Sequence, residues 1–223
     1  MLNKFITVLI IEISKFLTSN KDFLSSNKTD REKAIAEVKF PTPVKAYLVE
    51  VTEDQFIKDL AGITQFLKTP NLDFSKNEFA VAITHFLVSS FANDIYSLPL
   101  NYFKLSYKDQ QETVNEVIKS NSELANALKE ILTDYSYQEI LNGIQTLAKN
   151  TLNSPLVIIQ SPTEIDLEIK KDIHQNLNAN LQKICLPIFQ VNKNLIGGMR
   201  LFVDGKVTDL SWIARINLIT SLK

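Results

Sequence analysis

The side chains that could serve as nucleophiles, bases or metal ligands are few and scattered along the chain. There is one cysteine, Cys185, and there are two histidines, His85 and His174. His85 lies beside an apolar helical stripe, which predicts a core or boundary position, whereas His174 stands among charged residues, which predicts a solvated helix face. With no HExxH pair and no second cysteine, the sequence offers no zinc site.

The remaining candidates for chemistry have structural readings that suit them better. Cys185 stands between Ile184 and Leu186, and this apolar setting predicts a buried thiol rather than a nucleophile. Asp204 and Asp209 resemble a carboxylate pair, but the first begins an Asp-Gly turn and the second precedes a helix start. Neither GxGxxG nor GxxxxGK[ST] occurs. We therefore expect no catalytic residue, no cofactor and no metal.

The stretch with the clearest residue pattern lies near the C-terminus. Residues 199–203 alternate between two faces, which predicts a strand. Asp204-Gly205 follows, and this pair favours a two-residue hairpin turn because both central residues need positive φ. Residues 206–208 then return as a second strand. The sequence therefore predicts a tight β-hairpin.

Glycines lead into this hairpin, and a capped helix follows it. Gly197 and Gly198 stand where a Cβ would crowd the backbone or forbid the dihedral angle. Ser211 is a good N-cap, and apolar residues recur at helical spacing after it. The whole piece reads as strand, turn, strand and amphipathic helix.

This piece resembles the C-terminal signature of the δ subunit of F-type ATP synthases, the family of the mitochondrial oligomycin-sensitivity-conferring protein. The turn reads Asp-Gly where Gly-Asp is common, and Leu210 and Ala214 stand where glycine is expected. The structural motif comprises Leu195, Ile196, Gly197, Gly198, Arg200, Asp204, Gly205, Asp209, Ser211 and Arg215. The remaining positions that match the signature are Asn192, Leu201, Val203, Lys206, Val207 and Ile216.

The resemblance implies a non-catalytic peripheral-stalk subunit that resists the torque of the rotor. Its N-terminal bundle would hold N-terminal segments of the α subunits, and its C-terminal domain would hold the membrane-anchored b subunits. Membrane association would be indirect, at the cytoplasmic face of a bacterial membrane or its organellar equivalent. The alternatives are an E-type stalk subunit of a V-type ATPase, and an unrelated small adaptor or enzyme.

Composition agrees with a folded protein that does not bind nucleic acid. The 223 residues suit one large domain or two small ones, and 45% hydrophobic content supports a real core. A net charge of −1 gives no electrostatic reason to bind nucleic acid. A single cysteine excludes an intramolecular disulfide framework and favours a reducing compartment.

Before about residue 150, short amphipathic helices follow one another. Each buries one stripe, so they are expected to pack as a bundle. Residues 44–51 are rich in β-branched side chains and leave helix or strand open. Most helices are expected to begin at a Ser or Thr with Glu or Gln three residues on, or at a lone serine: Thr29–Glu32, Thr52–Gln55, Ser75–Glu78, Ser136–Glu139 and Ser122.

The first segment, residues 5–13, is too short to span a bilayer and reads either as a helix packed on the protein or as a membrane-surface or targeting helix. We expect an N-terminal helical extension of unassigned role at 1–40, a helical bundle at 41–150 and a small α/β domain at 151–223. The predicted fold class is α+β and mostly α, with a short mixed sheet in the last domain.

In that last domain, residues 156–160 read as a strand. Ser161 and Pro162 then suggest a helix start, with isoleucines and leucines every four residues from Ile165 to Leu181 as its apolar stripe. Residues 184–188 alternate as the next strand. Pro187 lacks an amide donor, which predicts that this strand lies at an edge or that Pro187 points its nitrogen away from the strand partner.

Overall fold

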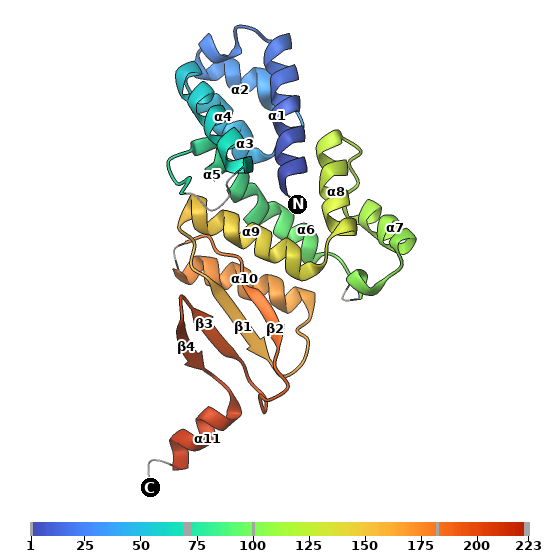
Figure 1. The fold of residues 1–223 in the computed structure, drawn as a ribbon, viewed down its shortest axis with the longest axis vertical. Helices are drawn as coiled ribbons and strands as arrows, with labels where there is room; N and C mark the ends of the chain where they lie inside the picture. Colours follow the sequence, from blue (N-terminus) through green and yellow to red (C-terminus); the bar gives the residue numbers. More distant parts are fainter. Residues whose placement is uncertain (1, 69–72, 100, 182, 221–223) are drawn as a thin grey trace. The chain divides into compact units, whose positions relative to one another are not determined.

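A computed structural model of the chain describes residues 2–68, 73–99, 101–181 and 183–220, without the side chains of residues 67 and 217–220. The chain divides into two compact units, Met1–Asn153 and Ser154–Lys223. The first unit is helical, and the second contains the sheet (Figure 1).

The first unit is a bundle of short helices. A π-helical turn, Leu87–Phe91, joins α5 to α6. The segment at residues 44–51, for which the sequence left helix or strand undecided, is helical up to Glu50 as part of α3, and Val51 is the C-cap. Helix α3 has a proline in its first turn. The α-helices are α1 (Leu2–Ser19), α2 (Lys28–Ala36), α3 (Thr42–Glu50), α4 (Glu53–Lys68), α5 (Glu78–Phe86), α6 (Ala92–Tyr96), α7 (Tyr107–Val117), α8 (Glu123–Asp134) and α9 (Tyr137–Leu152).

The first helix belongs to the core of this unit. Its apolar face is buried, and it packs against α8. Of the two readings for the first segment, the structure therefore supports a helix packed on the protein. Among the described residues, no helix is both long enough and apolar enough to cross a membrane. The buried residues of α1 are Leu2, Phe5, Ile6, Leu9 and Ile13.

Some of the predicted helix caps are confirmed. Ser122 and Ser136 cap α8 and α9, the latter with a complete capping box. The amide of Gln55 donates to the hydroxyl of Thr52 at the start of α4.

The caps predicted at Thr29 and Ser75 are wrong. The side chains of Asn27 and Asn77 take these positions and accept from the third amide of α2 and α5. Asparagine caps as well as serine does, so the sequence contained two competing starts at each place.

The second unit holds a four-stranded mixed sheet in the order β2-β1-β3-β4. Strand β1 (Val157–Ser161) pairs in parallel with β2 (Ile188–Val191) and antiparallel with β3 (Arg200–Val203). The hairpin partner of β3 is β4 (Lys206–Asp209). Helix α10 (Leu167–Leu181) connects β1 to β2, and α11 (Trp212–Thr220) follows β4. The predicted fold class is confirmed.

Two boundaries in this unit differ from prediction. Ser161 does not cap a helix; it is the last residue of β1, and α10 begins at Leu167. The next strand begins at Ile188, and Cys185 and Leu186 lie buried in the segment before it. This strand lies at an edge of the sheet, as predicted.

The face of α10 that packs on the sheet also differs from prediction. The buried residues are Lys170 and His174, whereas Ile169 is 49% exposed. Residues spaced by four drift about 40° around a helix at each step, so a long stripe of this spacing winds off any one face. The ammonium of Lys170 lies 5.8 Å from the centre of the Phe189 ring on β2, which places α10 over this face of the sheet.

Candidate functional site

The backbone crosses itself closely at the glycine pair. Gly197 and Gly198 have φ of +70° and +73°, in the left-handed region. A Cβ on Gly198 would lie 2.5 Å from the carbonyl oxygen of Leu210, and one on Gly197 would lie 2.7 Å from the Trp212 ring. The amide of Leu210 donates to the carbonyl of Met199 at 2.9 Å and joins the two segments. Both positions therefore need glycine.

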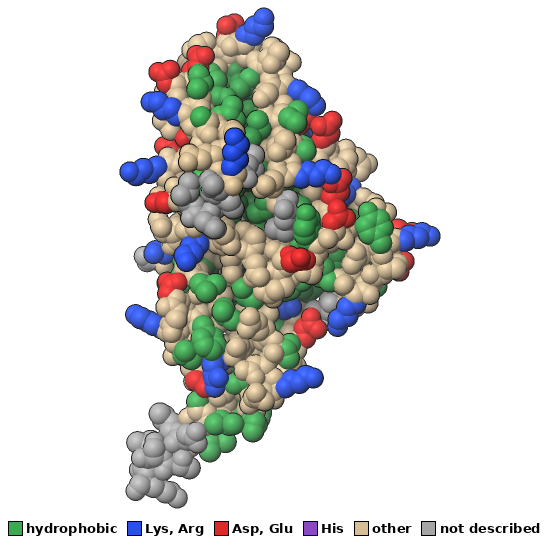
Figure 2. Space-filling model, in the orientation of Figure 1, with side chains coloured by type: hydrophobic (Ala, Val, Ile, Leu, Met, Phe, Trp, Pro, Cys, Tyr) green, Lys and Arg blue, Asp and Glu red, His purple; other side chains and the backbone are tan. Residues whose placement is uncertain are grey.

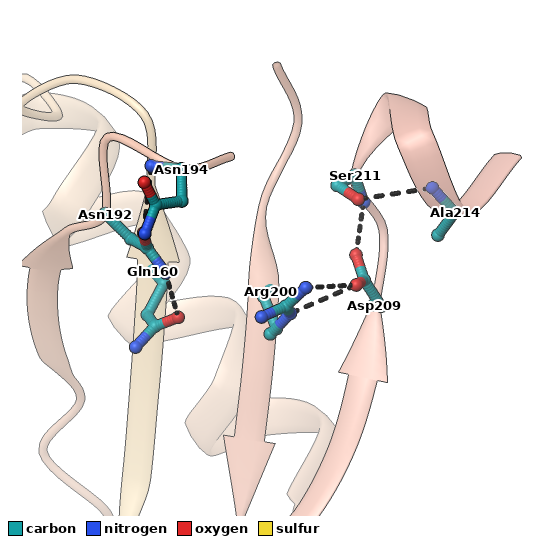
Figure 3. A network of polar contacts seen from close by, with 7 residues as sticks. All are labelled: Gln160, Asn192, Asn194, Arg200, Asp209, Ser211 and Ala214. Carbon is teal, nitrogen blue, oxygen red and sulfur yellow. Dashed lines mark hydrogen bonds and ion pairs between the residues drawn. The ribbon is translucent and has the colours of Figure 1, made fainter. Parts of the chain in front are cut away.

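A charged pair connects the hairpin to the last helix (Figure 3). Arg200 on β3 donates to Oδ2 of Asp209 on β4 from Nε at 3.0 Å and from Nη2 at 2.6 Å. The other carboxylate oxygen accepts from the amide of Ser211 at 2.9 Å, and the Ser211 hydroxyl accepts from the amide of Ala214 at 3.3 Å. The hairpin thus fixes the residue that caps α11.

The environment of Asp209 makes it a poor acid or base at neutral pH. Hydrogen bonds from the hydroxyl and amide of Ser211, and then from Arg200, hold the pKa of this carboxyl at about 2. Asp209 therefore stays ionised, which suits a residue that orients a helix start.

Asp204 closes the hairpin against the first strand of the sheet. Its φ is +47° and that of Gly205 is +81°, as an Asp-Gly turn requires. Its Oδ1 accepts from the amide of Leu156 at 2.9 Å, and its amide donates to the Leu156 carbonyl at 3.0 Å. Asp204 and Asp209 thus have separate partners, which argues against a shared acid–base role.

Three of the ten motif positions lie outside these contacts. Ile196 and Arg215 are exposed, whereas Leu195 is buried. The sequence reasoning missed Gln160, whose Oε1 accepts from the side chain of Asn192 at 3.0 Å (Figure 3). Its position as a polar residue at the end of an apolar strand was the available signal.

Opposite the face covered by α10, the sheet carries a polar row beside an apolar row. Register partners share a face, so Gln190, Gln160, Arg200 and Asp209 form one row across the four strands. The second row lies two residues away from the first on each strand and consists of Ile188, Ile158, Phe202 and Val207. Phe202 is half-buried and Val207 is exposed. This apolar row therefore remains partly open to solvent.

Apolar side chains gather on the surface of the second unit. Figure 2 shows them on the β3–β4 hairpin and at the start of α11. Two backbone hydrogen bonds, from Leu210 to Met199 and from Trp212 to Gly197, bring the two segments together. We define the C-terminal apolar surface as Ile196, Met199, Val207, Leu210, Trp212, Ile213 and Ile216, all of them exposed.

The prediction that His174 lies on a solvated helix face is wrong, because its side chain is only 3% exposed. Its Nε2 donates to the carbonyl of Cys185 at 2.8 Å, and the amide of Cys185 donates to Asn178 on the same helix at 2.8 Å. Cys185 is a buried thiol, as predicted, and burial raises its pKa to about 11. Helix α10 thus holds the segment that leads into β2.

The burial of His174 predicts how stability depends on pH. Burial lowers the pKa of this imidazole, and the hydrogen bond to Cys185 opposes the shift only in part. The unfolded chain then takes up a proton first as the pH falls below about 6.5, so the second unit is expected to lose stability there. Fluorescence of Trp212, the single tryptophan, should give a lower denaturant midpoint at pH 5.5 than at pH 7.5. His174→Gln should remove the difference and His85→Gln should keep it; the reverse pattern would contradict this assignment.

The described residues contain no cluster of three or more His, Cys, Asp or Glu side chains that could hold a metal ion. A family model described as ATP synthase delta (OSCP) subunit matches residues 92–222, more than half of the chain. The chain belongs to this family. None of the curated proteins compared with it matches. The match to the delta (OSCP) model begins at α6, so helices α1 to α5 precede it.

Members of the ATP synthase delta (OSCP) family are non-catalytic subunits of the peripheral stalk of F-type ATP synthases. The chain is therefore a stalk subunit that acts in ATP synthesis and proton transport as part of that membrane complex, to which it is peripheral. The match favours this reading over the alternatives of a V-type E subunit, an unrelated adaptor or an enzyme.

Proposed function

We propose that the two units of this stalk subunit bind different partners and so connect the catalytic head to the membrane-anchored b subunits. The second unit receives the helical end of the b subunits, and the first unit holds N-terminal segments of the α subunits. Such a connector resists rotor torque through packing and needs no perturbed catalytic group. In a bacterium it would lie at the cytoplasmic face of the membrane.

The observation that carries the proposal for the b subunits is the C-terminal apolar surface. Ten of the fourteen large apolar side chains that are exposed among the described residues belong to the second unit. A solvated surface of this kind is costly for a monomer and typical of a docking site for an amphipathic helix. Phe202 on β3 and Ile158 on β1 share a row with Val207 of this surface and continue it across the sheet.

The proposal for the α subunits is supported by a groove in the first unit. The groove has a volume of 710 Å³ and is lined by α1, the segment from the end of α2 into α3, α5, α6 and the segment from the end of α7 into α8. This volume is sufficient for several side chains of a docked helix. We define the α1–α8 groove by its apolar lining residues, which include Phe5, Phe86, Ile118, Leu124, Ala125 and Leu128.

Docking of the b subunits is expected to be mainly apolar, because the chain has a net charge of −1 and the surface consists of hydrophobic side chains. Calorimetric titration of the full chain with a peptide from the C-terminal helix of the cognate b subunit should give micromolar or tighter binding. The affinity should be similar at low and high salt, since screening weakens charged contacts and spares apolar ones.

A pair of variants identifies the surface. Trp212→Ala should weaken binding of the b peptide by at least about tenfold, because an aromatic anchor commonly contributes 2 kcal/mol or more, roughly, to an interface. Ile57→Ala, at an exposed position of the first unit that is 58% exposed against 59% for Trp212, should leave binding unchanged. No binding by the unmodified chain would refute the proposed partner. Binding that is lost above physiological salt would refute the apolar mechanism.

A further inference from the structure

The α1–α8 groove contains one carboxylate that has no partner. Asp94 on α6 lines this groove, and its carboxylate makes no hydrogen bond or ion pair within the part of the chain that the structure describes. Burial alone raises the pKa of this carboxyl to about 6. Asp94 is half-buried, so its carboxylate keeps contact with solvent and a cation from outside the chain can reach it.

The other charged groups that line the groove do not compensate Asp94. The ammonium of Lys45 donates to the carbonyl of Ala36 at 2.8 Å. Lys39 and Lys119 are exposed, and no lysine contributes to the shift at Asp94. Glu37 adds a further negative charge. A positively charged side chain of a bound partner can therefore pair with Asp94.

We propose that the α1–α8 groove takes an amphipathic helix of the α subunit that bears one lysine or arginine within its apolar face, and that this cation pairs with the carboxylate of Asp94. The inference rests on the proposed function of the first unit and adds the residue that selects the partner. A wholly apolar helix would bury the carboxylate without compensation, so Asp94 discriminates against it. A helix whose cation pairs with this carboxylate compensates the desolvation of Asp94 and therefore binds more tightly.

The pairing makes binding depend on pH. The free carboxyl of Asp94 takes up a proton below about pH 6, and it must lose that proton to pair with a cation. Affinity for the cationic helix therefore falls as the pH drops below about 6. His85 on α5 is the histidine of this unit, and burial lowers its pKa. It remains in Asp94→Asn, so that variant separates the two contributions.

The test is calorimetric titration of the full chain with a synthetic peptide of the N-terminal segment of the cognate α subunit. At pH 7.5, Asp94→Asn should weaken binding by about tenfold and should leave the thermal midpoint of the free chain unchanged or raised. Asp54→Asn removes an exposed carboxylate on α4 and should change neither quantity. The affinity of the unmodified chain should fall from pH 7.5 to pH 5, and that of Asp94→Asn should not.

A peptide in which the basic residue of the apolar face is replaced by glutamine provides the second arm. Because the two groups pair, the losses from this peptide and from Asp94→Asn should not add. Equal affinity of the unmodified chain and Asp94→Asn for the original peptide would overturn the role of Asp94 and leave the proposed partner standing. Additive losses would also overturn the pairing. Absence of binding by the unmodified chain would overturn both proposals.

Discussion

Gly198→Val is expected to destabilise the second unit by about 3 kcal/mol. The residue has φ of +73°, a region that costs a β-branched side chain about 1–3 kcal/mol. The new Cβ would also meet backbone, 2.5 Å from the Leu210 oxygen and 2.9 Å from the Ser211 Cα, and backbone at a crossing has little freedom to move away. The denaturant midpoint measured by Trp212 fluorescence should therefore fall, while helical circular dichroism of the first unit persists.

Gly198→Ala and Gly205→Ala form a matched pair that separates the two causes of this loss. In the second variant the added Cβ is at Gly205. Its φ is +81°, but no atom lies within 4 Å of the added Cβ, so it tests the backbone conformation without the collision. We expect a loss of about 1 kcal/mol. Equal losses for Gly198→Ala and Gly205→Ala would show that the close approach at Leu210 carries no weight.

The hairpin was predictable from sequence because short-range chemistry determines it. An Asp-Gly pair between alternating segments requires two positive φ angles, and the structure has them at Asp204 and Gly205. Ser122 and Ser136 cap their helices for an equally local reason. Rules of this kind apply within three or four residues, and no distant contact competes with them.

Apart from the two helix caps where a nearby asparagine competes, the predictions failed where a distant element decides. His174 was predicted to lie on a solvated face because charged residues surround it in sequence, but its side chain is buried in the folded second unit, as is that of Lys170. Charge neighbours along a helix do not reveal which side faces a sheet. The sequence did not indicate a binding role for Asp94 for the same reason, because the groove that it lines is formed by segments that lie far apart in sequence.

In the candidate site, too, some features follow from local sequence and others from distant contacts. The glycine pair and the turn residues were recognised from spacing, whereas the connection from Arg200 through Asp209 to Ser211 depends on the register of β3 and β4. The match to a family signature marked these residues without giving their contacts. Gln160 became visible only when the parallel and antiparallel partners of β1 were known.

A second large effect is expected at Arg31, a buried residue of α2. Its guanidinium donates to four backbone carbonyls: Nε to Ser26 at 3.0 Å, Nη1 to Val49 at 3.2 Å and Val51 at 2.6 Å, and Nη2 to Leu24. The carbonyls of Val49 and Val51 lie at the C-terminal end of α3, where helix geometry leaves acceptors unpaired. One side chain thus satisfies the end of α3 and the turn before α2.

Arg31→Ala removes all of these donors and leaves buried acceptors without partners, which is expected to cost about 3 kcal/mol. Arg31→Lys keeps the positive charge but has a compact ammonium in place of the planar fork, so it should recover only part of the loss. Lys33→Ala, at an exposed position of the same helix, should lie within about 0.5 kcal/mol of the unmodified chain. Urea unfolding followed by circular dichroism measures all three. Full recovery by lysine would mean that charge at the end of α3, rather than the geometry of the guanidinium, stabilises this part of the bundle.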